Sequence, residues 1–205
     1  MSTAKPALYA VPGGAAGSAG AVPWTDRDDD ELMLLVAGGV RAAFDELVRR
    51  HRRRLLGVAT RYVRCPGLAH DVTQNTLIDI YRAAPRYQPR GSFTSFLYRA
   101  LLNQCRMAGR AKAAQERLQV TAAVALTEHP GETAEDQVLA RERERRVQRA
   151  LDRISEKLRA VVVLRYSGGL AYQEIADVLD IPVGTAKRRL FDAIEKLREL
   201  LAEEP

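Results

Sequence analysis

Cysteine, histidine and long apolar runs are scarce in this sequence. The 205 residues include 2 cysteines, Cys65 and Cys105, which form no CxxC pair, and 3 histidines that lie far apart. A disulfide framework and a zinc site are therefore not expected, and no cofactor or metal is predicted. No apolar run is long enough to span a membrane, and the N-terminus lacks the basic-then-apolar pattern of a secretion signal. The protein is expected to be cytoplasmic, without membrane insertion.

The residue groups of common active sites are also absent. Paired acids, Cys/His sets, phosphate-binding loops and metal clusters do not occur at workable spacing. We therefore do not expect an enzyme. There is no strand pattern of weight and no internal repeat, so the sequence predicts an all-α protein.

Positive charge, by contrast, is abundant and concentrated in the middle of the chain. The net charge is +6. Residues 41–117 contain 16 cations and 5 anions, whereas residues 118–205 contain 14 cations and 16 anions. A concentrated basic body indicates a polyanionic partner, and general solubility is the alternative explanation.

The chain divides into two helical parts. Residues 1–25 are rich in Ala, Gly, Pro and Ser, which is typical of a disordered tail. Helical periodicity predicts a four-helix body over residues 26–113 and a second helical domain over residues 134–205. Residues 114–133 lose the rhythm and are interpreted as a flexible linker.

Within the first part, acids ahead of Leu32 mark a helix start. Apolar steps of three and four predict helices over 41–62 and 68–84, and a fourth helix begins near Phe93. His51 lies on the apolar stripe of the first of these and is interpreted as a packed histidine. Tyr81 is expected to face inward with Thr73, Leu77 and Ile80.

The segment GGLAYQEIADVLDIPVGTAKRRLFDAIEKLREL, residues 168–200, predicts a helix-turn-helix. A short helix is followed by a tight turn at Asp180 and by a longer helix from Val183. In this motif the second helix enters the major groove with its N-terminus first, which suits its cluster of cations. Arginine pairs bidentately with guanine. The alternative is a plain helical hairpin with a solvated basic end.

Three motifs in the right order resemble the extracytoplasmic-function (ECF) class of the sigma-70 superfamily. LRYSGGLAYQEIADVLDIPVGTAKRRL resembles the family's C-terminal helix-turn-helix. DVTQNTLIDIY (71–81) resembles its polymerase-binding helix, and RYQPRGSFTSFLYRALLNQ (86–104) resembles its promoter −10 segment. The resemblance spans roughly residues 28–113 and 134–201. It implies a dissociable subunit that directs RNA polymerase core to promoters.

The resemblance also implies three sets of site residues. The residues expected to bind polymerase core are Asp71, Gln74, Asn75, Ile78 and Asp79. The residues expected at the −10 element, where aromatic rings and polar groups meet a flipped base, are Tyr87, Arg90, Ser92, Phe93, Phe96, Arg99, Asn103 and Arg106. The residues expected at the −35 element, within a helix-turn-helix over 172–191 and its continuation, are Tyr172, Thr185, Lys187, Arg188, Arg189 and Asp192. Among these, Arg188 with Thr185 and Asp192 is expected to face the groove, and Lys187 and Arg189 the phosphates. For Phe93, Phe96 and Tyr98, simple core packing is the alternative.

Four positions depart from the family pattern. Asn75 replaces a usual glutamate in the polymerase-binding helix, and Phe96 replaces a common tryptophan. Asp180 replaces the usual turn glycine, and aspartate tolerates a left-handed backbone better than most residues. Ala186 replaces a common valine.

The implied partners are the beta and beta-prime subunits of RNA polymerase core, promoter DNA and an anti-sigma factor. As a free coil the 23 residues 114–136 would span about 25–29 Å. Promoter elements two DNA turns apart are separated by roughly 70 Å. The two domains are therefore expected to lie closer together in the free protein than on DNA, in a compact state that a partner could trap.

Two rival functions remain open at this point. A stand-alone helix-turn-helix operator-binding regulator would explain residues 155–201 but not the basic body. A helical scaffold or anti-sigma-like interaction protein predicts no DNA contact.

Overall fold

The computed structural model describes residues 24–63, 65–89, 92–118 and 135–203. In these ranges the secondary structure consists of eight α-helices and two 3-10 turns, which confirms the all-α prediction. The elements in chain order are η1 (Trp24–Asp26), α1 (Asp29–Ala37), α2 (Arg41–Val63), α3 (Pro66–Ala83), η2 (Ala84–Arg86), α4 (Phe93–Leu118), α5 (Glu135–Arg153), α6 (Glu156–Tyr166), α7 (Tyr172–Leu179) and α8 (Val183–Glu203).

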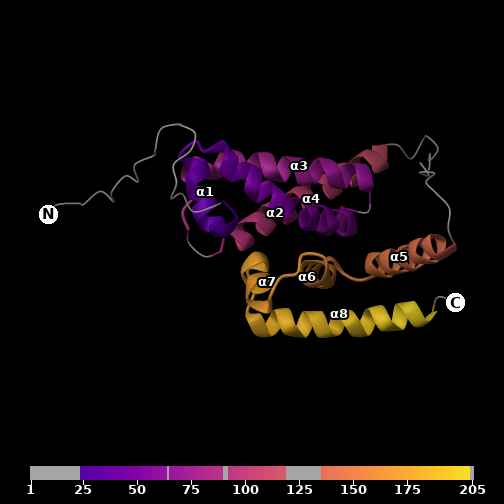
Figure 1. Ribbon diagram of the computed structural model, residues 1–205. Coiled ribbons are helices and arrows are strands. Elements are labelled where there is room, and N and C mark those ends of the chain that lie inside the picture. Colours follow the sequence, from indigo (N-terminus) through magenta and orange to yellow (C-terminus); the bar gives the residue numbers. More distant parts are fainter. Residues whose placement is uncertain (1–23, 64, 90–91, 119–134, 204–205) are drawn as a thin grey trace.

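The helices form two groups, α1–α4 and α5–α8, which lie one above the other in Figure 1. In the first group α2 packs against α1, α3 and α4. In the second group α6 lies between α2 of the first group and α8, as Figure 1 shows. Because α6 is covered on both sides, Val161, Val162, Val163 and Leu164 are all buried.

The first group follows the predicted apolar stripes. Leu47, Leu55 and Val58 of α2 are buried, while Arg52, Arg53 and Arg54 are exposed. His51 is buried, as expected of a packed histidine, and its Nε2 lies 2.6 Å from a carboxylate oxygen of Asp29 in α1.

The expectation for Tyr81 was wrong. Its side chain is 49% exposed on α3, and its ring meets that of Phe44 edge-on with centroids 4.9 Å apart. The apolar stripe of α3 is buried at Val72 and Ile80, and Tyr81 lies next to Ile80, about 100° further round the helix. Helical periodicity assigns residues at the edge of an apolar stripe to the buried face. Whether such a residue is buried depends on the helix that packs against it.

Two segment boundaries differ from the predictions. Residues 1–23 of the predicted tail lie outside the described residues, but Trp24 begins a 3-10 turn, and its carbonyl accepts a hydrogen bond of 2.7 Å from Arg50. The fourth helix continues past Ala113 to Leu118, into the predicted linker. The rest of that linker, up to residue 133, lies outside the described residues.

The turn of the helix-turn-helix has the predicted backbone. Asp180 ends α7 in the left-handed region, with φ 53° and ψ 54°. The Ile181 N–H donates to the carbonyl of Ala176 at 3.0 Å, which closes the end of α7. Helix α8 then begins at Val183, as predicted.

The two groups of helices share one buried apolar core, and polar contacts join them as well. The hydroxyl of Tyr98 in α4 donates to the carbonyl of Gly168 at 3.2 Å. Glu156, at the start of α6, accepts from the Tyr62 hydroxyl at 2.8 Å and from Arg106 Nε at 3.1 Å. The predicted DNA-binding units are therefore packed against each other in this structure.

Candidate polymerase and DNA interfaces

The face of α3 predicted to bind polymerase is open to solvent. Its five residues are all exposed: Asp71, Gln74, Asn75, Ile78 and Asp79. Ile78 is 37% exposed, and Tyr81, one turn further on, adds a second exposed apolar side chain that the sequence prediction had placed inside. The carboxylate of Asp79 accepts a hydrogen bond of 2.5 Å from Gln104 of α4, so this acid is oriented along the surface.

The predicted −10 loop joins η2 to α4 and borders a cleft of about 890 Å³. Tyr87 and Phe96 are half-buried in its wall, with ring centroids 5.3 Å apart. Ser92 precedes α4, and its Oγ accepts the N–H of Ser95 at 3.2 Å, as an N-cap does. The opposite wall belongs to the helix-turn-helix: it is formed by Ala176, Asp177, Asp180, Ile181 and Pro182.

Two aromatic residues of this region belong to the core. Phe93 is 2% exposed and Tyr98 is 1% exposed, so the core-packing alternative holds for both in this structure. The Phe93 ring lies against His51 and Tyr87, with centroids 5.6 Å and 6.2 Å away, and is not available to stack on a base here. Arg90 lies outside the described residues.

The polar face of α4 is exposed at Arg99, Asn103 and Arg106, as the spacing predicted. Its two arginines point toward the second group of helices: Arg99 donates to the backbone carbonyl of Asp177 in α7, and Arg106 donates to Glu156 in α6. Local periodicity placed these cations on one face, but it could not indicate that another part of the same chain lies there.

The N-terminal part of α8 presents its cations unequally. The Arg188 side chain is 84% exposed and forms a long ion pair of 3.9 Å with Asp192. Lys187 places its ammonium 5.6 Å from the centroid of the Tyr172 ring, and Arg165 occupies another position on that ring at 5.2 Å. Thr185 and Arg189 are half-buried. Arg188 and Lys187 are thus exposed, whereas Arg189 is half-buried.

One residue of this surface was missed by the sequence analysis. Phe191 of α8 is 65% exposed, three residues after Arg188 and so on the same side of the helix. The signal was present in the sequence, because Phe191 falls outside the apolar positions Ala186, Leu190, Ala193 and Ile194. An exposed phenylalanine beside a predicted base-contacting arginine suits contact with a thymine methyl group.

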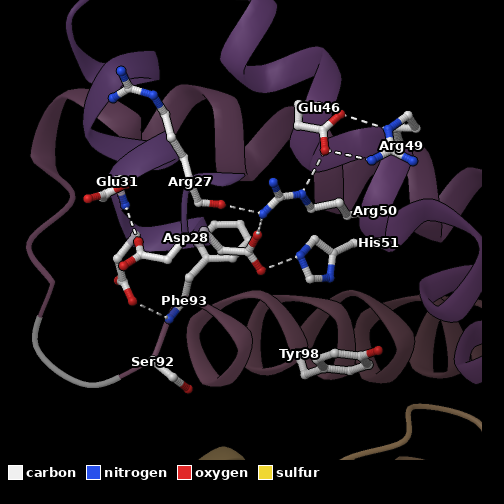
Figure 2. A network of polar contacts seen from close by, with 12 residues as sticks. Arg27, Asp28, Glu31, Glu46, Arg49, Arg50, His51, Ser92, Phe93 and Tyr98 are labelled. Carbon is white, nitrogen blue, oxygen red and sulfur yellow. Dashed lines mark hydrogen bonds and ion pairs between the residues drawn. The ribbon is translucent and has the colours of Figure 1, made fainter. Parts of the chain in front are cut away.

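A polar network holds the N-terminal segment and α1 on α2 (Figure 2). Arg50 is at its centre: it donates to the carbonyl of Arg27, to Asp29 and to Glu46, each at 2.8 Å. Hydrogen bonds from Arg49 and Arg50 lower the pKa of Glu46 to about 2. Burial by itself would raise the pKa of Asp29, but the hydrogen bonds from His51 and Arg50 outweigh it and lower that pKa. These acids therefore stay ionised at neutral pH and anchor α1.

Two tyrosines that bond to acids also have shifted pKa values. Burial and the hydrogen bond to Glu156 raise the pKa of Tyr62, and burial and the hydrogen bond to Asp30 raise the pKa of Tyr87. Hydrogen bonds from Tyr62 and Arg106 lower the pKa of Glu156. Both hydroxyls thus remain protonated and able to donate.

The described residues contain neither a metal-binding cluster nor a membrane-spanning helix. No group of three or more His, Cys, Asp or Glu side chains that could hold a metal ion occurs among the residues with described positions. No helix in that part of the chain has the length and apolar character needed to cross a bilayer.

The chain was compared with protein families and with known proteins. Residues 47–115 match the model of Sigma-70 region 2, and residues 144–197 match the model of Sigma-70, region 4. The chain is 31% identical over 184 residues to the RNA polymerase sigma-H factor of Pseudomonas aeruginosa, which covers 86% of this chain and 95% of that protein. It is 31% identical over 176 residues to the ECF RNA polymerase sigma-E factor of Haemophilus influenzae, covering 82% of this chain and 93% of that protein. The chain belongs to the ECF sigma factors of the sigma-70 family.

A solved structure has a similar fold. CnrH in complex with the cytosolic domain of CnrY superposes with a TM-score of 0.68 at 26% identity, over 86% of this chain and 99% of that chain. The protein is an RNA polymerase sigma factor, which directs core polymerase to promoters and starts DNA-templated transcription. The alternative of a stand-alone operator-binding regulator is not favoured.

Proposed function

We propose that this sigma factor uses three surfaces, one for polymerase and two for DNA. The exposed face of α3, together with Tyr81, binds polymerase core. The loop after η2 and the polar face of α4 bind the −10 element, and the start of α8 with Phe191 binds the −35 element. On this proposal residues 26–118 form the polymerase and −10 unit, and residues 134–205 form the −35 unit. The chain acts in the cytoplasm and performs no catalysis itself.

The contact between Arg99 and the carbonyl of Asp177 supports a closed free state. This contact joins a residue proposed for the −10 strand to the helix-turn-helix, and the −10 loop shares one cleft with the end of α7 and the turn after it. A strand of DNA cannot occupy a surface that the other unit covers. The α3 face stays exposed, so polymerase can bind first and separate the two units.

The test is promoter binding with and without core polymerase. We expect the isolated protein to shift duplex promoter DNA weakly in a gel, and the reconstituted holoenzyme to shift it and to start run-off transcription at defined sites. Mapping those start sites across the genome would give the promoter sequence. Tight, polymerase-independent binding to a duplex site would contradict the proposal and support the operator-binding alternative.

A protein partner that holds the closed state would regulate this sigma factor. CnrH, whose structure this chain resembles, was solved with the cytosolic domain of CnrY bound. We propose that an anti-sigma factor binds this chain in a comparable way, stabilising the contacts between α4 and α7.

Glu156 provides a direct test of the closed state. Replacing Glu156 by alanine removes the acceptor of both Tyr62 and Arg106, which join the two groups of helices. Because the Glu156 side chain is 57% exposed, solvent screens the pair, and we expect opening to become more favourable by about 1 kcal/mol, or roughly fivefold. Fluorescence energy transfer between labels on α3 and α8 should fall.

The matched control is Glu203→Ala, which removes an exposed ion pair of 3.1 Å with Arg153 inside the second group. It should leave the transfer efficiency unchanged. Equal efficiencies for wild type, Glu156→Ala and Glu203→Ala would count against a role for Glu156 in closing the protein.

A further inference from the structure

Asp30 of α1 contacts both ends of the loop proposed to read the −10 element. One carboxylate oxygen accepts a hydrogen bond from the hydroxyl of Tyr87, the first residue after η2. The other accepts the backbone N–H of Phe93, the first residue of α4, at 3.4 Å. A single side chain thus joins the residue that enters the loop to the residue that leaves it.

The surroundings strengthen both contacts. Asp30 is half-buried, and α1 packs against η2 and α4, so water competes less for its oxygens. Burial and the hydrogen bond to Asp30 raise the pKa of Tyr87, as expected of a hydroxyl that donates to a carboxylate. The N–H of Phe93 lies at the positive end of the α4 dipole, which favours a carboxylate.

Neighbouring acids already perform the other tasks at this helix start, as Figure 2 shows in part. Asp28 caps α1 by accepting the N–H of Glu31 at 2.7 Å. Asp29 anchors α1 to α2 through Arg50 at 2.8 Å and His51 at 2.6 Å. Asp28 thus caps α1 and Asp29 anchors it to α2, whereas Asp30 bonds to the loop.

The positions of the aromatic rings beside the loop depend on where the two ends of the loop are held. Tyr87 lies against Phe96, and both line the cleft together with Gln88, Ser92 and Ser95. If the hydroxyl of Tyr87 were released, its ring would keep its contacts with Phe93 and Phe96 but lose the hydrogen bond that fixes its outer end, and the cleft would change shape. Helix α1 lies outside the matched Sigma-70 region 2, which begins at residue 47.

We propose that Asp30 is a positioning residue for base recognition at the −10 element. By joining Tyr87 to the start of α4, it keeps the cleft in the shape that accepts one unpaired base of the non-template strand. Asp30 acts through the loop and does not contact DNA. This inference rests on the proposed function of the loop and adds the device that preorganises it.

The experiment measures base preference in reconstituted holoenzyme. The probe is a pool of single-stranded DNA randomised over the −10 segment, which is bound, recovered and sequenced. For Asp30→Asn we expect the preference for the best base at one position to fall about tenfold, since an amide cannot replace a charged acceptor for two donors. Tyr87→Phe, which keeps the ring, should give the same fall, and the double variant should add nothing further.

The matched control is Asp28→Asn, which removes the same charge at the start of α1 and leaves both hydrogen bonds from the loop to Asp30 in place. It should keep the wild-type preference. Core affinity and selection of duplex −35 sequences should be unchanged in Asp30→Asn, whereas a general loss of structure would reduce both. If Asp30→Asn proves unfolded by circular dichroism, Tyr87→Phe decides the result, because it leaves α1 intact.

The possible outcomes separate the two proposals. Wild-type preference retained in folded Asp30→Asn, or in Tyr87→Phe, would overturn the role of Asp30 while leaving the −10 function in place. Additive losses in the double variant would also overturn it, because Tyr87 would then act on the base independently. No preference at any position in the wild type would overturn the −10 function itself, and the role of Asp30 with it.

Discussion

Holoenzyme carrying Arg188→Ala should use its promoters about 5- to 150-fold less than wild type, because one bidentate arginine–guanine contact is worth about 1–3 kcal/mol. Arg188 is 84% exposed near the start of α8, and its ion pair with Asp192 is long at 3.9 Å. Little is therefore lost when the guanidinium turns from Asp192 toward DNA. Run-off transcription from mapped promoters measures the effect.

Two further variants, one at Arg188 and one elsewhere in α8, serve as comparisons. Arg188→Lys keeps the charge but not the planar fork, so phosphate attraction should survive while base preference at the −35 element relaxes. Arg198→Ala removes another exposed arginine of α8, paired with Glu195 at 2.6 Å and far from the helix tip. It should transcribe like wild type. Equal losses in Arg188→Ala and Arg198→Ala would indicate a nonspecific charge effect and contradict base reading by Arg188.

Gly168→Ala should destabilise the fold clearly. A Cβ at this position would lie 2.6 Å from the Leu164 carbonyl oxygen, 2.9 Å from Leu170 Cδ1 and 3.2 Å from Tyr98 Cε1. The first of these is backbone, which cannot move without disturbing the end of α6. Overpacking of this kind costs about 1–3 kcal/mol, which for a chain of this size lowers the melting temperature by roughly 2–12 °C.

Gly168 also lies at the contact between the two groups of helices, because its carbonyl accepts a hydrogen bond from the Tyr98 hydroxyl of α4. The variant should therefore also open the closed state, seen as lower energy transfer between labels on α3 and α8. Gly109→Ala in α4 is the matched control, since a Cβ there would meet no atom within 4 Å. In a helix interior it should raise stability slightly, by up to about 1 kcal/mol. Similar melting temperatures for both variants would show that the Gly168 site relaxes at little cost.

Periodicity and turn chemistry were sufficient to predict the helices and the helix-turn-helix. The start of α1, the start of α8 at Val183 and the left-handed Asp180 all depend on interactions within a few residues, which local sequence specifies. The exposed α3 face was predictable for the same reason. The site residues themselves remain predictions, to be tested as described above.

Contacts between distant residues could not be predicted in this way. The sequence alone could not tell that Phe93 is buried against His51, or that Tyr81 is left uncovered. The acidic run of residues 28–30 predicted a helix start, but not that its three carboxylates have different partners. Those partners come from α1, α2 and the loop before α4, and loop geometry is set by the elements that pack around it.

By itself the sequence determined the family, the all-α class and the positions of the helices, because these depend on local spacing and on motifs with a defined order. The tertiary structure decided which of the predicted DNA-binding side chains are accessible in the free protein. Arg99 and Arg106 lie on the face that periodicity predicts, yet they bond to α7 and α6. Packing between the two groups of helices joins residues about 50 to 80 positions apart, and helical periodicity carries no information at that range.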